Sequence, residues 1–318
     1  AASGYYLIEK TEPVTSVAAD LIVNFGSIND NGESLSLARK PTGDATTTLD
    51  TVAICIGGGT QWCAGDAASR ISLERYDPLS SGADTSNWSG NLGEFILNGS
   101  DRDGTALFGT PRQRNSANYL ISLSSTLSGD KTLSASSSPY LVGRSGLTVG
   151  SGVTLTIPAG IVVKTVSPNT PTITINGILN TLGSTSSPAI FTSFYDDASG
   201  GDTNGDGGAT SPAAGNWRQL RFMSGSTGSS LSYTDVFYGG NAHSLAPQGA
   251  VGVESATVSF SHMRVATSST SGIALSSSDS TIAHSIFSGN SASSASAAGV
   301  AASGGTPMTP FIARRVIE

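Results

Sequence analysis

The sequence predicts an all-β protein, in which a β-sandwich is followed by a solenoid of short, stacked parallel strands. Between Pro139 and Asp206, β-forming runs of three to five residues alternate with a glycine or a polar kink. Hairpin proteins have longer strands and two-residue turns, so frequent corners between short runs favour stacked coils. In the first third of the chain, strand-like runs recur about every eight to twelve residues between turn sequences, which is typical of a sandwich.

The composition of the 318 residues indicates two domains with a hydroxyl-rich surface. Apolar residues make up 37%, enough for compact cores, whereas charged residues make up only 12%, which favours a secreted or surface-exposed protein. The net charge is −7, the pI is near 4.9 and no run of Lys or Arg is present. We therefore expect neither nucleic acid nor an anionic membrane as a partner. No apolar stretch reaches the roughly 18 residues of a membrane-spanning helix.

The two cysteines, Cys55 and Cys63, predict a disulfide. Three glycines, Gly57 to Gly59, lie between them and allow a short loop to fold back. Closing such a loop would contribute about 2.5 kcal/mol in the chain-entropy model. The alternative is two unrelated buried thiols. A disulfide implies an oxidising compartment, so we expect the protein outside the cell or on its surface.

The predicted sandwich occupies residues 1–118. Its first strand-like runs are Tyr5–Ile8, Leu21–Phe25, Ser34–Leu37 and Thr51–Ile54. Asn29–Gly32 and Pro41–Asp44 supply turn residues between them.

These residues resemble a bacterial lamin-tail domain. The resemblance is carried by Ser27–Leu37, Leu49 and Asp50, Trp62, Ser72–Arg75, Asn87 and Trp88, Gly109–Pro111, and Asn115 and Ser116. It implies an immunoglobulin-like sandwich that serves as an accessory module of extracellular proteins and has no catalytic set. Trp62 and Trp88 are then expected to pack in the core, although flat aromatics also stack on sugars. Glu74 and Arg75 are expected to form a structural pair.

From residue 119 to residue 318 the texture changes to Ser, Thr and Gly with short strands. The segments that carry the pattern are Ser138–Val142, Leu147–Val149, Gly152–Lys164, Thr172–Ile175, Gly177–Gly183 and Pro188–Ser193. They resemble the right-handed parallel β-helix of bacterial surface proteins and pectate-lyase-like folds. That scaffold carries lyases, glycosidases, adhesins and plain stalks, so the resemblance implies a fold and no single activity.

Later coils can be aligned on their apolar residues. Leu231–Tyr238, Val258–Val265 and Ser280–Phe287 share one pattern, and Trp217–Leu220, Ala250–Val253, Gly272–Leu275 and Gly299–Ala302 share a second. In this alignment Tyr233, Phe260 and Ile282 stack inside the tube. Asp235, His262 and His284 then share one outward position, where they would form a ladder able to bind a transition metal or relay protons. The alternative is that outward positions before a bend are polar by default.

An acidic segment predicts a calcium site formed by Asp196, Asp197, Asp202, Asn204 and Asp206. Oxygen donors alternate at positions 202, 204 and 206 and a glycine follows, as in loops that wrap a hard cation. An EF-hand would have a glutamate at position 213, which is Ala213, so the bidentate ligand would come from Asp196 or Asp197. The stretch contains no Lys or Arg to neutralise its carboxylates. The alternative is a solvated acidic loop.

We expect no catalytic residue and no organic cofactor. The carboxylates on predicted strands are few, and the alignment pairs none with a base on the adjacent coil. The expected function is that of a non-catalytic structural or adhesive protein of the bacterial cell surface, calcium-stabilised and able to self-assemble into filaments or a surface layer. The partners would be copies of itself or extracellular glycans. The alternative is polysaccharide binding, or a lyase or hydrolase activity on the flank of the β-helix. An ice- or mineral-binding face through Thr148, Thr154 and Thr156 ranks last, because these threonines do not recur in the alignment.

Overall fold

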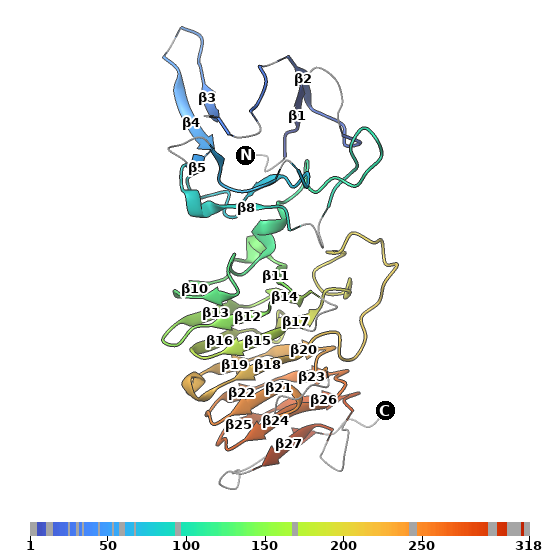
Figure 1. The fold of residues 1–318 in the computed structure, drawn as a ribbon. Helices are drawn as coiled ribbons and strands as arrows, with labels where there is room; N and C mark the ends of the chain where they lie inside the picture. The colour runs from blue at the N-terminus through green and yellow to red at the C-terminus, as the bar shows by residue number, and fades with distance from the viewer. Residues whose placement is uncertain are drawn as a thin grey trace. The chain divides into compact units, whose positions relative to one another are not determined.

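The computed structural model is an all-β chain that divides into two compact units, residues 1–123 and residues 124–318 (Figure 1). It describes residues 5–10, 15–24, 26–29, 32–33, 35–43, 45–52, 54–56, 61–66, 68–92, 97–166, 171–241, 247–291, 298–303 and 313–314. Of the residues discussed above, Phe25, Ser34, Asp44 and the glycines at 57–59 lie outside this set. Within it, the helices are single 3-10 turns, and none is long and apolar enough to cross a membrane.

The second unit is a right-handed parallel β-solenoid of about six turns, which confirms the predicted coil (Figure 1). The first sheet contains β9 (Thr126–Leu127), β12 (Leu147–Val149), β15 (Thr172–Ile175), β18 (Gln219–Phe222), β21 (Gly249–Glu254), β24 (Ser271–Ser276) and β27 (Val300–Ser303). The second contains β10 (Lys131–Thr132), β13 (Thr154–Pro158), β16 (Ile178–Leu182), β19 (Ser230–Ser232), β22 (Ser259–Ser261) and β25 (Thr281–Ala283). The third contains β11 (Tyr140–Val142), β14 (Val162–Thr165), β17 (Ala189–Ser193), β20 (Thr234–Phe237), β23 (Arg264–Ala266), β26 (Ser285–Ser288) and β28 (Ala313–Arg314). The chain visits the three sheets in turn, so each strand pairs with its counterpart one coil earlier.

Alternation along each strand builds the core of the solenoid. Leu147 and Val149 on β12 are buried while Thr148 between them faces outward, because successive side chains of a strand point to opposite faces. In register, Leu147 meets Ile173 and Val149 meets Ile175 on the next coil. Apolar side chains therefore form continuous columns inside the tube.

The register corrects the predicted alignment at one coil. Leu231, not Tyr233, lies in the column with Phe260 and Ile282, and Leu220 pairs with Val251 instead of Val253. Both errors are slips of two residues. Because side chains alternate with a period of two, such a slip keeps apolar residues inside, and the pattern alone does not reveal it.

The first unit contains four two-stranded pairs among its described residues. β1 (Ile8–Lys10) and β2 (Leu21–Val23) are parallel, whereas β3 (Leu35–Arg39) with β4 (Thr47–Val52), β5 (Ile54–Ile56) with β6 (Gln61–Trp62), and β7 (Leu73–Arg75) with β8 (Trp88–Gly90) are antiparallel. The strands confirm the all-β character. In the described part of this unit they form separate pairs and not two facing sheets.

The 3-10 turns lie in both units. They are η1 (Thr85–Asn87) and η2 (Ser116–Tyr119) in the first, and η3 (Ala135–Ser137) and η4 (Ser224–Ser226) in the second.

Covalent and polar contacts hold the first unit together. A disulfide joins Cys55 to Cys63, as predicted. Glu74 on β7 is 2% exposed, and its carboxylate accepts hydrogen bonds from Asn91, Thr110, Ser116 and the backbone N–H of Ala117.

The predicted pairing of Glu74 with Arg75 is wrong, because neighbouring strand residues point to opposite faces. Arg75 instead pairs with Asp50 at 2.6 Å and covers the ring of Trp88. The indole N–H of Trp88 donates to the carbonyl of Gly82, and that of Trp62 donates to the carbonyl of Asn29. Both tryptophans are therefore tied to neighbouring backbone.

Candidate metal centre

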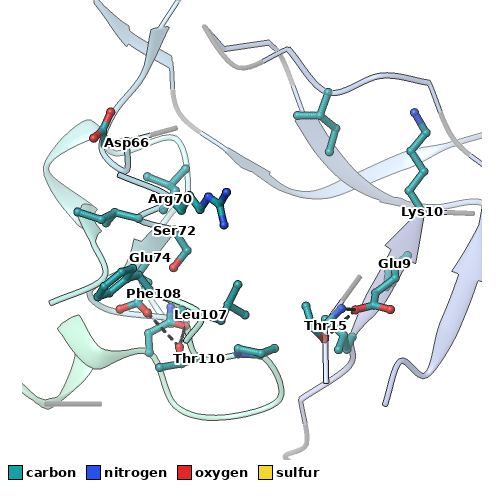
Figure 2. Close-up of a pocket in the computed structure, with 18 of the residues that line it drawn as sticks. Glu9, Lys10, Thr15, Asp66, Arg70, Ser72, Glu74, Leu107, Phe108 and Thr110 are labelled. Atoms are coloured by element: carbon teal, nitrogen blue, oxygen red, sulfur yellow. Dashed lines mark hydrogen bonds between the residues drawn. The ribbon is translucent and has the colours of Figure 1, made fainter. Parts of the chain in front are cut away.

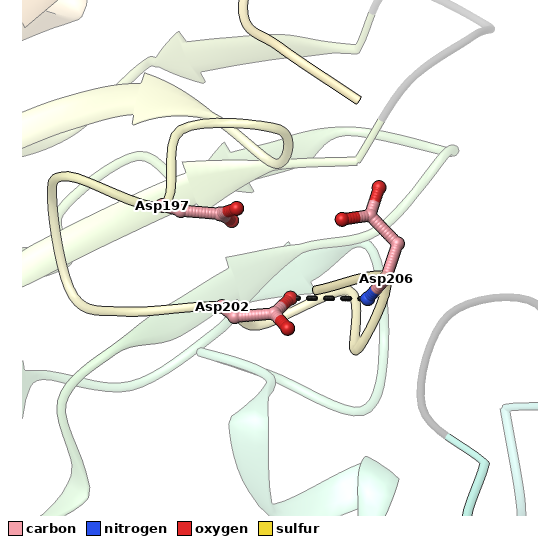
Figure 3. A group of neighbouring side chains, drawn as sticks. All are labelled: Asp197, Asp202 and Asp206. Atoms are coloured by element: carbon pink, nitrogen blue, oxygen red, sulfur yellow. Dashed lines mark hydrogen bonds between the residues drawn. The ribbon is translucent and has the colours of Figure 1, made fainter. Parts of the chain in front are cut away.

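The predicted acidic segment lies in the loop between β17 and β18, on the wall of the solenoid. Figure 3 shows the carboxylates of Asp197, Asp202 and Asp206 turned toward a common region. One oxygen from each lies within 4.8 Å of the others. Among the described residues this is the one place where three His, Cys, Asp or Glu side chains converge in this way.

Backbone amides fix two of these carboxylates. Asp202 accepts from the N–H groups of Gly205 at 2.7 Å and Gly207 at 2.9 Å. Asp206 accepts from those of Gly208, Ala209 and Thr210, at 2.8 to 2.9 Å (Figure 3 draws the further bond from the Asp206 N–H to Asp202). The sharp turns require positive φ values, which glycine adopts without strain at Gly205 (+70°) and Gly207 (+66°).

These hydrogen bonds keep Asp206 ionised. The side-chain hydroxyl of Thr210, followed by the backbone amides, lowers the pKa of Asp206 below its ordinary value of 3.8. At neutral pH the loop therefore presents anionic oxygens in an ordered arrangement.

Two buried oxygens at the site have no hydrogen-bond donor among the described residues: Asp197 Oδ1 and Asn204 Oδ1. The Asn204 amide group donates to Asp206 Oδ2 at 2.8 Å and to the Thr210 hydroxyl at 3.0 Å, which fixes the orientation of the side chain. An unsatisfied buried acceptor costs about 1–3 kcal/mol. Calcium binds carboxylate and amide oxygens, so an ion held here would satisfy both atoms.

The fifth predicted residue, Asp196, has a different partner. It is 3% exposed and accepts a hydrogen bond from the hydroxyl of Thr192 on β17 at 2.6 Å. It is not one of the three carboxylates that converge, and its contact holds the start of the loop against the third sheet.

Sequence reasoning missed Lys164 on β14. This side chain is fully buried, and its ammonium donates to the carbonyl of Gly201 at 2.6 Å. Burial lowers the pKa of Lys164, while the charges of Asp196, Asp197 and Asp202 act in the opposite direction. The acidic segment contains no cation, but the folded loop has one from a strand about 40 residues earlier. The available signal was a lone lysine in the otherwise apolar run Ile161–Val166.

The predicted ladder of Asp235, His262 and His284 is correct for the histidines and wrong for the aspartate. The rings of His262 and His284 stack with centroids 4.8 Å apart, and Tyr233 stacks on His262 at 4.2 Å. Asp235 lies two residues further along, in register with Arg264, and pairs with it at 2.9 Å. The three rings face one another, so the ladder is a stack of aromatic rings on the solenoid surface.

The pair of Asp235 and Arg264 also corrects the expectation that no acid and base match on adjacent coils. Burial raises the pKa of Asp235, and Arg264 opposes that effect. The guanidinium of Arg264 covers the ring of Phe237. On the first sheet, Arg221 pairs with Glu254.

The threonines considered for an ice- or mineral-binding face do recur over a short distance. Thr148 lies in register with Thr126 and Thr174, and Thr156 lies in register with Thr132 and Asn180. The first column ends at Arg221 on the next coil. The repeat of threonine is thus limited to three coils.

The first unit has a cavity of about 830 Å³, lined by residues of β1, β7 and the segment 107–111 (Figure 2). Its carboxylates take part in hydrogen bonds of the fold: Glu9 accepts from the Thr15 hydroxyl at 2.8 Å, and Glu74 has the four donors described above. Leu107 and Phe108 contribute apolar surface.

Comparison of the chain with models of protein families, with curated proteins and with solved structures finds no match.

Proposed function

We propose that the protein is a non-catalytic structural or adhesive protein of the bacterial cell surface, with a solenoid stabilised by calcium. The single observation that carries the proposal is the convergence of Asp197, Asp202 and Asp206 beside two buried oxygens that lack a donor among the described residues. A divalent cation would balance the carboxylates and satisfy both oxygens.

The remaining parts of the proposal follow from composition and fold. The disulfide and the low charge content support an extracellular location. The resemblance of residues 1–118 to a lamin-tail domain supports an accessory module with an immunoglobulin-like sandwich, and that of residues 119–318 supports a β-helix of the bacterial surface-protein or pectate-lyase-like type. Stacked coils pair through their backbone, so the ends of the stack favour assembly into filaments or a surface layer, and the hydroxyl-rich flank favours extracellular glycans as ligands.

Calorimetric titration of the full chain with calcium tests the metal. Asp197→Asn is the sharpest variant, because the Oδ1 atom of Asp197 has no donor among the described residues and its change leaves the amide bonds of Asp202 and Asp206 in place. We expect wild-type protein to release or absorb heat on binding and Asp197→Asn to bind at least tenfold more weakly. Asp279→Asn removes the same charge elsewhere in the solenoid and serves as the matched control. Absence of binding heat in wild-type protein would refute the calcium site.

A second candidate function, polysaccharide cleavage on the flank, is favoured by the surroundings of Tyr238. Burial raises the pKa of Tyr238, the charge of Asp196 adds to that effect and Arg264 opposes it. A phenol and a guanidinium near a calcium loop are groups that remove a proton and neutralise a uronate carboxylate. Incubation with pectin and alginate, followed by absorbance of unsaturated products, tests this activity. Product formation that Tyr238→Phe abolishes would replace the non-catalytic proposal.

A further inference from the structure

Lys164 is buried by the acidic loop and not by the interior of the solenoid. On β14, Val163 faces inward and pairs with the buried Phe191, so Lys164 faces outward next to Thr192. An outward lysine on a solenoid wall is ordinarily exposed, yet this one is fully buried. Gly200 of the loop packs against Val162 of the same strand, where an added Cβ would lie 3.3 Å from the side chain.

Three contacts connect the loop to the outer face of the third sheet. The Lys164 ammonium donates to the carbonyl of Gly201, the Thr192 hydroxyl donates to Asp196, and Gly200 lies on Val162. Gly201 directly precedes Asp202 in the sequence. The lysine therefore fixes the backbone next to one of the three converging carboxylates.

The charges at the loop do not balance without a further cation. Asp196, Asp197, Asp202 and Asp206 carry four negative charges when ionised, and Lys164 supplies one positive charge. Like charges with oxygens within 4.8 Å of one another repel strongly where water is partly excluded. An ammonium nearby reduces this repulsion, and it also reduces the attraction of the site for calcium.

We propose that Lys164 is the internal counter-ion of the acidic loop. It holds the loop on the third sheet in the absence of metal and keeps calcium affinity below the value that the carboxylates alone would give. This inference rests on the proposed calcium site. The affinity of calcium sites depends on their charge count, and extracellular modules bind at about 10⁻⁴ to 10⁻³ M. A loop weakened by its own lysine would respond to calcium in that range and stay ordered below it.

The test measures calcium affinity by calorimetry and thermal unfolding in EDTA, for the full chain and two variants. Lys164→Met removes the charge and keeps the apolar stem, and Lys131→Met removes a lysine from the second sheet of the same unit as the matched control. We expect Lys164→Met to bind calcium about tenfold more tightly, to melt at lower temperature in EDTA, and to regain most of that loss with calcium. Lys131→Met should behave as wild type. Equal or weaker calcium binding by Lys164→Met, alongside normal wild-type binding, would overturn the counter-ion role and leave the calcium site intact.

A double variant separates the inference from the calcium site. In EDTA, Lys164→Met/Asp197→Asn removes one charge of each sign, so we expect it to melt at higher temperature than Lys164→Met alone. Additive losses would overturn the inference whether or not the wild type binds calcium. If Lys164→Met does not fold, a folded double variant supports the counter-ion role and an unfolded one overturns it. No calcium heat in the wild type, with the double variant still recovered, would refute calcium binding and retain the electrostatic contact.

Discussion

The two units bury different kinds of side chain. In the described part of the chain, every buried apolar residue lies at or after Ala117, and most belong to the columns of the solenoid. The buried residues before that point include Glu9, Glu74, Asn91 and Thr110. The exposed large apolar side chains cluster in the first unit, where Leu37 and Leu49 are 64% and 60% exposed.

This difference follows from the presence or absence of a repeat. In the solenoid, each coil offers an apolar column to the next, so burial accumulates with every turn. The first unit has no repeat, and its described strands form separate pairs, which are marginal on their own. Its order depends on particular contacts: the Glu74 network, the pair of Arg75 with Asp50, and the disulfide.

Removing one residue from an apolar column should have the largest effect. Phe260 is 1% exposed and packs edge-on to Phe222 with ring centroids 6.0 Å apart. Phe260→Ala should lower the free energy of unfolding of the solenoid by about 3–5 kcal/mol, since it loses transfer energy and leaves a cavity. Urea unfolding followed by circular dichroism measures the loss. Ser259→Ala, on the exposed face of the same strand, is the control and should cost under about 0.5 kcal/mol.

Removing the central carboxylate of the first unit should have the next largest effect. Glu74→Ala leaves Asn91, Thr110 and Ser116 without their acceptor, and we expect a loss of about 2–4 kcal/mol. Hydrogen exchange should accelerate in peptides covering residues 72–92, with no change in β12 to β24. Equal acceleration in the solenoid would contradict the separation of the two units.

Loss of the disulfide should be smaller and equally local. A Cys55→Ser/Cys63→Ser variant should lose about 2.5 kcal/mol, because the covalent closure of a short loop restricts the unfolded chain. The same exchange experiment should detect faster exchange in β5 and β6. An unchanged rate there would mean that the loop is ordered by other contacts.

The smallest effect should be the response of two exposed carboxylates to acid, one in each unit. Hydrogen bonds lower the pKa of Asp206 in the loop and of Asp84, which caps η1. A lowered pKa in the folded state means that the stabilisation is present above the unfolded value of 3.8 and is lost as pH falls through the folded value. Carbon-detected NMR titration should therefore give midpoints below 3.8 for both. A midpoint at or above that value would contradict the loop geometry.

How much of the molecule was predictable from sequence follows the same division. Short runs such as Leu147–Val149 and Thr172–Ile175 predicted strands β12 and β15 at their observed bounds, because alternation and turn residues agree there. The two-residue slip at Leu231 escaped detection because period-two patterns fit either register. In the first unit, pairing depends on contacts between distant residues, such as Glu74 with Ser116, which no local pattern encodes.

The acidic loop was predictable in its ligands and not in its counter-charge. Spacing alone predicted that Asp202 and Asp206 lie together, since alternate residues of a tight loop share a side. Lys164 approaches from a strand one coil earlier, so its position depends on the stacking of coils. The same holds for Tyr233, which takes the place predicted for Asp235 beside His262.

Hydrogen exchange of the full chain with and without calcium tests the central claim most directly. If calcium binds between Asp197, Asp202 and Asp206, the amides of Gly205, Gly207 and Gly208 should exchange more slowly when calcium is added, because their acceptors become fixed. Peptides from the first unit and from β21 to β24 should exchange at the same rate in both conditions. Identical exchange across residues 196–210 in calcium and in EDTA would contradict the calcium site.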